Sequence, residues 1–111
     1  MWYGIGILYE EFSSYEHAVQ AFTAALNMDQ KFDKNVEICE RLGNIYKHLK
    51  EYDKALQSYM EIQNYRSVLS NDISLKIGEC YQLLDKFDEA ADYYKKILMV
   101  YILSIIHSQA R

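Results

Sequence analysis

One pattern recurs three times along this 111-residue chain, and it constrains the fold more than any other feature. Three glycines mark its register: Gly6, Gly43 and Gly78. Each glycine directly follows an aliphatic residue. A tyrosine lies three positions after it, an alanine twelve positions after it and a second aromatic residue sixteen positions after it. In this order the residues are Ile5, Tyr9, Ala18 and Phe22 in the first repeat, Leu42, Tyr46, Ala55 and Tyr59 in the second, and Ile77, Tyr81, Ala90 and Tyr94 in the third. A unit of this size cannot bury its apolar face alone, so the pattern predicts stacked repeats.

The apolar residues inside each repeat are spaced as on one face of a helix. In the first repeat Ile5, Leu8 and Tyr9 follow the three-and-four spacing of an amphipathic helix. The chain has no proline and only four glycines, as expected of a mostly helical protein. We therefore predict an all-α fold of three helix pairs. The helices are expected to include residues 1–12, 15–28, 38–49, 52–64, 73–84 and 87–98.

Small residues are expected to bring the two helices of each pair together. Gly6 lets the second helix lie close to the first, and Ala18 presents the small surface that meets it. The same couples recur as Gly43 with Ala55 and Gly78 with Ala90. Around the first couple we expect five side chains to fill the remaining space: Trp2, Ile5, Tyr9, Phe22 and Ala25.

The connections are predicted from polar residues and spacing. A hydroxyl of Ser13 or Ser14 is expected to cap the second helix, and Asn71 or Asp72 the fifth. Gly6 and Gly43 lie 37 residues apart, so the polar turn at 27–34 or the helix after it should be longer than in a 34-residue repeat.

The first repeat resembles the tetratricopeptide repeat (TPR). It reads W-Y-G-I-G-I-L-Y, followed by Ala18, Phe22 and Ala25. Later repeats depart from the motif where Cys39 and Ser74 replace the Trp, and the usual Pro is missing throughout. The resemblance implies a TPR superhelix, an α–α solenoid, over residues 1–98, with repeats at about 1–31, 36–66 and 71–101.

The expected functional surface is the concave groove, lined by the first helix of each repeat. Repeat register places nine residues there: Tyr3, Ile7, Glu10, Glu40, Asn44, Lys47, Leu75, Glu79 and Gln82. This mixed apolar and acidic set suits an extended or helical protein segment with apolar anchors and some positive charge. The alternative is that these three repeats are only a fragment of a scaffold and bind no ligand themselves.

Repeat domains that hold the acidic C-termini of chaperones resemble this fold and provide a specific comparison. Their clamp uses Lys and Asn in the first helix, Asn in the third, and Lys and Arg in the fifth. Here Asn44 matches the third-helix position, but Tyr3 and Ile7 occupy the first-helix positions, and Leu75 and Glu79 the fifth-helix ones. A carboxylate would meet Glu79 rather than a cation, which argues against this ligand.

A more specific resemblance lies in the opening W-Y-G-I-G followed, after a long spacing, by N-V-E-I-C-E-R-L-G-N-I-Y-K-H. It is similar to the repeat region of the general transcriptional corepressor subunit that partners a WD40 corepressor, and to that of the related histone H3 lysine-27 demethylases. The resemblance implies a nuclear, non-enzymatic scaffold linking DNA-bound transcription factors to a WD40 partner. The alternative is a generic adaptor in a cytoplasmic assembly, trafficking or cell-cycle complex.

Composition and the remaining motifs exclude several other functions. A net charge of −4 without a Lys/Arg stripe argues against direct binding to nucleic acid. His17, His48 and His107 lack partners at metal-ligand spacing, and no phosphate-binding loop stands out, so we expect no metal, no cofactor and no catalytic residue. Cys39 and Cys80 are expected to be reduced and buried.

The last stretch, residues 99–111, departs from the repeat pattern. It is apolar on nearly every side, but its apolar run is too short to cross a bilayer, and no signal peptide precedes the first repeat. It is expected to fold over the open end as a cap, to mark a portion of a longer array, to come from a gene model that runs past its exon, or to mediate dimerisation.

Overall fold

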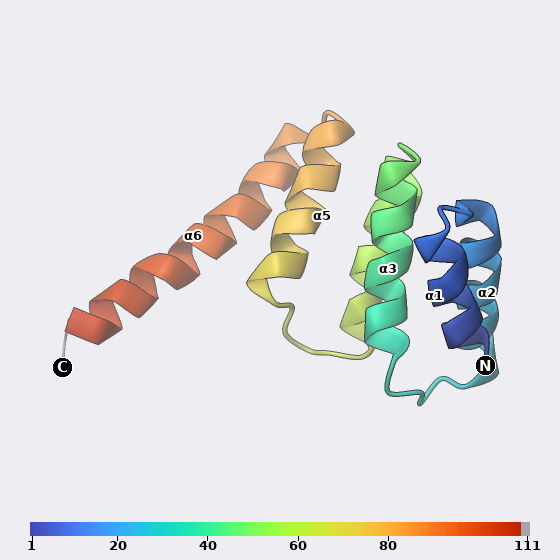
Figure 1. Ribbon diagram of the computed structural model, residues 1–111. Helices are drawn as coiled ribbons and strands as arrows, with labels where there is room; N and C mark the ends of the chain where they lie inside the picture. The colour runs from blue at the N-terminus through green and yellow to red at the C-terminus, as the bar shows by residue number, and fades with distance from the viewer. Residues whose placement is uncertain (110–111) are drawn as a thin grey trace.

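The computed structural model describes residues 1–109 and contains three antiparallel helix pairs placed side by side (Figure 1). The elements are α1 (Trp2–Glu11), α2 (Tyr15–Met28), α3 (Asn35–His48), α4 (Tyr52–Met60), the 3₁₀ turn η1 (Glu61–Asn64), α5 (Asn71–Leu83) and α6 (Phe87–Gln109). Helices α1, α3 and α5 form one layer, and α2 and α4 lie behind it. No strand occurs within the described residues, so the predicted all-α solenoid is confirmed.

Each register glycine packs against an aromatic ring of its own repeat. A Cβ atom added to Gly6 would lie 2.6 Å from Cδ1 of Phe22, and one added to Gly78 would lie 2.8 Å from Cε1 of Tyr94. Gly43 meets the ring of Tyr59 in the same way. Because each ring rests directly on helix backbone, no side chain larger than hydrogen fits between them.

This geometry corrects the predicted glycine–alanine couples. The atoms nearest to Gly6 belong to Phe22 and not to Ala18, although Ala18 is fully buried. The aromatic residue sixteen positions after the glycine therefore sets the approach of the two helices. Trp2 and Tyr9, expected between the helices and the next repeat, are 38% and 39% exposed, so they are only partly enclosed.

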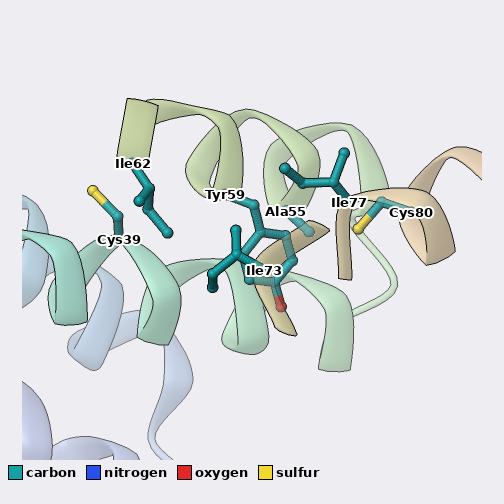
Figure 2. Close-up of a cluster of buried hydrophobic side chains, with 7 residues drawn as sticks. All are labelled: Cys39, Ala55, Tyr59, Ile62, Ile73, Ile77 and Cys80. Atoms are coloured by element: carbon teal, nitrogen blue, oxygen red, sulfur yellow. The ribbon is translucent and has the colours of Figure 1, made fainter. Parts of the chain in front are cut away.

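Two apolar clusters join consecutive repeats. The first contains Ala18, Phe22, Ala25, Ile38, Leu42 and Ile45, from α2 and α3. The second contains Cys39, Ala55, Tyr59, Ile62, Ile73, Ile77 and Cys80, from α3, α4, η1 and α5 (Figure 2). The second helix of each repeat thus packs against the first helix of the next, which makes the array continuous.

Both cysteines belong to the second cluster, as free and buried thiols, which confirms the prediction. Burial, assisted by the charge of Glu61, raises the pKa of Cys39 from 9.0 to about 11. Burial likewise raises the pKa of Cys80. Both residues therefore act as small apolar side chains that stay protonated at neutral pH.

The turn inside each repeat uses a left-handed residue that is not glycine. Ser13, Lys50 and Asp85 have φ values of 59°, 63° and 60°, and each lies seven residues after its register glycine. The next residue donates its N–H to the carbonyl of the residue five positions earlier, as Glu51 does to Tyr46 at 2.8 Å. This hydrogen bond is the closing bond of a Schellman motif, in which glycine is the usual left-handed residue.

The predicted caps are wrong in detail. Ser14 is the residue before α2, but its hydroxyl lies 2.9 Å from Nδ1 of His17 and makes no cap hydrogen bond. Ser70, rather than Asn71 or Asp72, caps α5 by accepting from the N–H of Ile73 at 3.2 Å. The turn at 29–34, between α2 and α3, has as many residues as the turn at 65–70, between η1 and α5, so the longer first spacing comes from the helices beside the turn and not from the turn itself.

Helix α6 runs far beyond the other second helices of the repeats. Residues 99–109 continue it as a straight extension away from the body, so they do not fold back over the open end as a cap (Figure 1). Its large apolar side chains are exposed from Leu98 to Ile106. Within the described residues, no helix combines the length and apolar character needed to cross a membrane.

We predict that Gly43→Ala lowers the free energy of unfolding by about 1–3 kcal/mol, because the new methyl group would overlap the ring of Tyr59. Gly4→Ala is the matched control, since Gly4 is also helical and a Cβ there meets no atom within 4 Å. The free energy of unfolding of Gly4→Ala should rise by up to about 1 kcal/mol, because alanine has a higher helix propensity than glycine. Urea unfolding of both variants measures the difference, and equal stabilities would contradict the ring–backbone contact.

We predict that Lys50→Gly raises the free energy of unfolding by about 0.5–1 kcal/mol, because glycine adopts the left-handed conformation without strain. Lys95→Gly, at an exposed position inside α6, should instead lower the free energy of unfolding by about 1 kcal/mol, because glycine has a low helix propensity. Thermal unfolding followed by circular dichroism compares the two. A loss of stability in Lys50→Gly would show that the Lys50 side chain stabilises the turn.

Candidate functional site

The nine predicted groove residues all lie on the layer formed by α1, α3 and α5. Tyr3, Ile7 and Glu10 belong to α1, Glu40, Asn44 and Lys47 to α3, and Leu75, Glu79 and Gln82 to α5. We call this layer the A-helix surface. Most of its side chains are partly buried, because they contact the neighbouring helix as well as solvent. Asn44, Leu75 and Gln82 are the exposed members.

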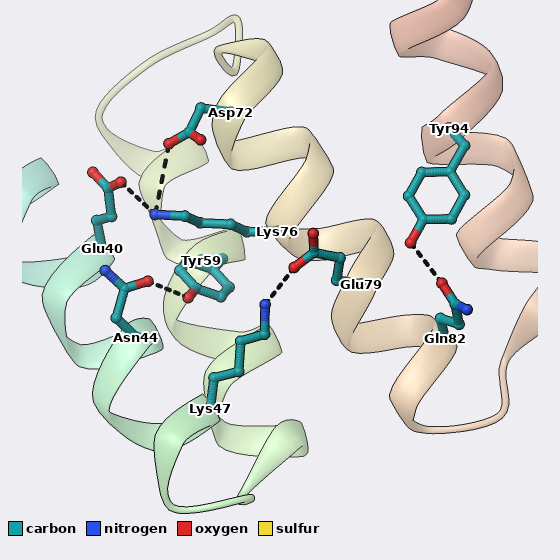
Figure 3. Close-up of polar contacts among 9 residues, drawn as sticks. All are labelled: Glu40, Asn44, Lys47, Tyr59, Asp72, Lys76, Glu79, Gln82 and Tyr94. Carbon is teal, nitrogen blue, oxygen red and sulfur yellow. Dashed lines mark hydrogen bonds and ion pairs between the residues drawn. The ribbon is translucent and has the colours of Figure 1, made fainter.

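Ion pairs connect successive helices across the A-helix surface. Arg41 of α3 binds Glu10 of α1 at 2.8 Å. Lys76 of α5 binds Glu40 of α3 at the same distance (Figure 3). In both pairs, a cation from the later helix reaches a carboxylate of the earlier one. The pairs therefore link the first helices of all three repeats across this surface.

A third ion pair joins Lys47 of α3 to Glu79 of α5 (Figure 3). Asp72 adds a weaker contact to Lys76 at 3.6 Å. Burial works against the charge of Lys76, but the hydrogen bond and charge of Glu40, joined by Asp72, outweigh it and raise the pKa of Lys76. Lys76 therefore stays charged at neutral pH despite its partial burial.

Tyrosine hydroxyls complete the polar network. The hydroxyl of Tyr59 donates to Asn44, and that of Tyr94 donates to Gln82 at 2.9 Å (Figure 3). The hydroxyl of Tyr3 donates to Glu37. In the first two contacts an aromatic side chain from the second helix of a repeat orients an amide on its first helix. Burial and nearby carboxylates raise the pKa of Tyr59, so its hydroxyl remains a donor.

This network defines what the surface can bind. The cations Arg41, Lys47 and Lys76 are each already held by a carboxylate. Apolar contact comes from the exposed Leu75 and the half-buried Ile7. The surface thus combines fixed charge pairs with apolar anchors, which suits a protein segment better than a single charged ligand.

Six residues of this network were not among the predicted set: Glu37, Arg41, Asp72 and Lys76 on the first helices of the repeats, and Tyr59 and Tyr94 on the second helices. A sequence signal existed for the two cations. Both stand two residues before a register glycine, where repeat one has Gly4. A basic residue recurring in register on helices that face carboxylates predicts pairing between neighbouring helices.

A cleft with a volume of about 720 Å³ lies away from the A-helix surface, between α2 and α4. Leu42 and Tyr46 of α3 contribute to its lining, and neutral amides such as Asn27, Gln57 and Asn64 surround it. Within residues 1–109, no group of three or more His, Cys, Asp or Glu side chains is arranged to hold a metal ion.

Comparison with known families assigns all three repeats. Residues 1–32 and 36–67 each match the tetratricopeptide repeat, and residues 72–98 match a second description of the same repeat. Two of the three matches follow one another across α1 to η1, and the third covers α5 and the first half of α6.

Among curated proteins, the chain is similar to transcriptional corepressors over a short stretch. It is 63% identical over 38 residues to the general transcriptional corepressor trfA of Dictyostelium discoideum. It is 55% identical over 38 residues to the general transcriptional corepressor ssn6 of Schizosaccharomyces pombe. Each match covers 34% of this chain and only 3% of the relative's length. The resemblance to the corepressor repeat region is therefore confirmed for that stretch.

Solved structures show the same fold at low sequence identity. The MamA protein superposes with a TM-score of 0.76 at 23% identity, covering 88% of this chain and 51% of MamA. The second TPR of Spaghetti (RPAP3), bound to the HSP90 peptide SRMEEVD, superposes with a TM-score of 0.72 at 16% identity, covering 88% and 87% of the two chains. With the repeat matches covering most of its length, this chain belongs to the tetratricopeptide repeat family.

Proposed function

We propose that the chain is a protein-interaction module of a transcriptional corepressor, which binds its partners through the A-helix surface. The observation that carries the proposal is the 63% identity over 38 residues to a general transcriptional corepressor. The repeat family supports the broader part, since stacked repeats present extended binding surfaces to other proteins. No step of this function needs an enzyme activity.

The A-helix surface supports binding through preorganisation. Ion pairs from α1 to α3 and from α3 to α5 fix the spacing of the helices before a partner arrives. When a partner segment binds, it loses conformational freedom, but the surface is already ordered and loses little. This lowers the entropic cost of association. Leu75 and Ile7 are the apolar anchors, and the net charge of −4 favours a segment with some positive charge.

The proposed partners are a WD40 corepressor and DNA-bound transcription factors, and the proposed location is the nucleus. The chain carries a net charge of −4, and the three cations of the A-helix surface are paired with carboxylates. Direct binding to a phosphate backbone needs free cations. Chromatin is therefore reached through the partner proteins.

The proposal is tested by affinity capture with the immobilised 111-residue chain in nuclear and cytoplasmic extracts, followed by mass spectrometry. Recovery of a WD40 corepressor together with sequence-specific transcription factors supports the proposal. Recovery of cytoplasmic complexes alone contradicts it. Purified WD40 corepressor then replaces the extract, so that direct binding is measured.

We predict that Leu75→Glu reduces capture of the partner by about tenfold or more, because it places a charge at an apolar anchor that is 42% exposed. Val68→Glu is the matched control, since Val68 is exposed in the loop before α5, outside the A-helix surface. Both variants should unfold at the temperature of the unmodified chain. Equal losses of capture in the two variants would remove the A-helix surface as the binding site.

We predict that the peptide SRMEEVD, bound by the structural neighbour, binds this chain with a Kd weaker than about 0.1 mM. Its carboxylates would meet Glu79 and Glu40, and the nearby cations Lys47 and Lys76 are already paired. Isothermal titration calorimetry measures the affinity. Micromolar binding that is lost in Asn44→Ala would instead establish a carboxylate clamp on α3.

A further inference from the structure

The cleft between α2 and α4 has the size and lining of a binding site. Helix α2 packs against α1 and α3, and α4 packs against α3 and α5, so the two second helices leave a space between them. Its volume of about 720 Å³ falls within the range of about 300–1,000 Å³ of ligand pockets. Its apolar lining comes from the buried Leu42 and the half-buried Leu26 and Tyr46. No residue of α1 or α6 lines it, so the cleft belongs to the interior of the array.

Four neutral amides surround this apolar lining. They come from α2, the turn after it, α4 and η1, and all are exposed: Asn27, Gln30, Gln57 and Asn64. No hydrogen bond within residues 1–109 uses any of these four side chains. The amides of the A-helix surface differ, since tyrosine hydroxyls already donate to Asn44 and Gln82. The cleft therefore offers hydrogen-bonding groups that are free to meet a ligand.

Two of these amides recur in register. A glutamine stands fourteen positions after the register glycine in the first two repeats, as Gln20 and Gln57. An asparagine stands twenty-one positions after it, as Asn27 and Asn64. Gln20 is exposed on α2 but does not line the cleft, whereas Gln57 does. The chain thus contains the same side chain in the same register once inside the cleft and once outside it.

The charged lining of the cleft is balanced. Lys54 and Glu61 contribute one charge of each sign. The Nζ atom of Lys54 lies 5.7 Å from the centre of the Tyr46 ring and 3.7 Å from a carboxylate oxygen of Glu51. Because this cation already has two partners, a strongly charged ligand gains little here.

We propose that the α2–α4 cleft binds an extended, uncharged segment of a partner protein. An amide side chain both donates and accepts, so the four free amides match the N–H and C=O groups of an extended main chain. A helical segment would offer none of these groups, because its own hydrogen bonds use them. One apolar side chain of the segment lies against Leu26, Leu42 and Tyr46. The A-helix surface stays open, so the chain holds two partners at once.

The proposal is tested by selecting a phage-displayed library of random short peptides on the immobilised 111-residue chain. Recovered peptides should lack charge around one apolar residue. Fluorescence polarisation should show that their Kd rises about tenfold in the double variant Gln57→Ala/Asn64→Ala, which removes two hydrogen-bonding side chains. Gln20→Ala is the matched control and should bind them like the unmodified chain. Thermal unfolding of each variant confirms that it is folded.

Two further measurements separate the cleft from the A-helix surface and from a helical ligand. Leu75→Glu should leave the affinity unchanged, and peptides that all lose affinity in Leu75→Glu but none in the double variant would overturn the proposal. Methylating the main-chain nitrogens of a recovered peptide one at a time should raise its Kd about threefold or more at some position, because an N–H donor is lost. Unchanged affinity at every position, or a peptide that becomes helical on binding, would also overturn it.

Discussion

Close contact between a glycine and an aromatic ring is the constraint on which the rest of the structure depends. Phe22 lies on the backbone of α1 at Gly6, and Tyr59 lies on the backbone of α3 at Gly43. Each ring is fully buried and also belongs to the apolar cluster that reaches the next repeat. One side chain therefore sets the distance within a repeat and the packing between repeats. A change at the glycine would disturb both, because interiors this closely packed transmit small displacements.

The same aromatic position couples the core to the A-helix surface. Tyr59 fills the interior with its ring, while its hydroxyl donates to Asn44 on the outer face of α3. Tyr94 repeats the arrangement with Gln82. A tyrosine has this double role because its ring is apolar and its hydroxyl needs a partner. The amides of the A-helix surface are therefore positioned from within the core.

The repeated register allowed most of the fold to be predicted from the sequence, but not its local chemistry. Glycines, alanines and aromatics at fixed offsets define the helix pairs, since such spacing is a property of the whole repeat. The left-handed residue in each turn could not be found this way, because Ser13, Lys50 and Asp85 share only polarity and none is the glycine that usually marks this conformation. The nine groove positions follow from register, whereas their pairing partners depend on how far Arg41 and Lys76 reach across to the neighbouring helix.

The two ends of the array differ from its interior for one physical reason. Each interior helix is covered on both sides, so its stability includes contributions from two interfaces. Helices α1 and α6 each lack one, and both keep apolar residues at the uncovered positions, as Leu8 and Leu98 show. At the offset of Leu8 the other two repeats have the buried Ile45 and Cys80, so the residue type at that position follows the repeat pattern.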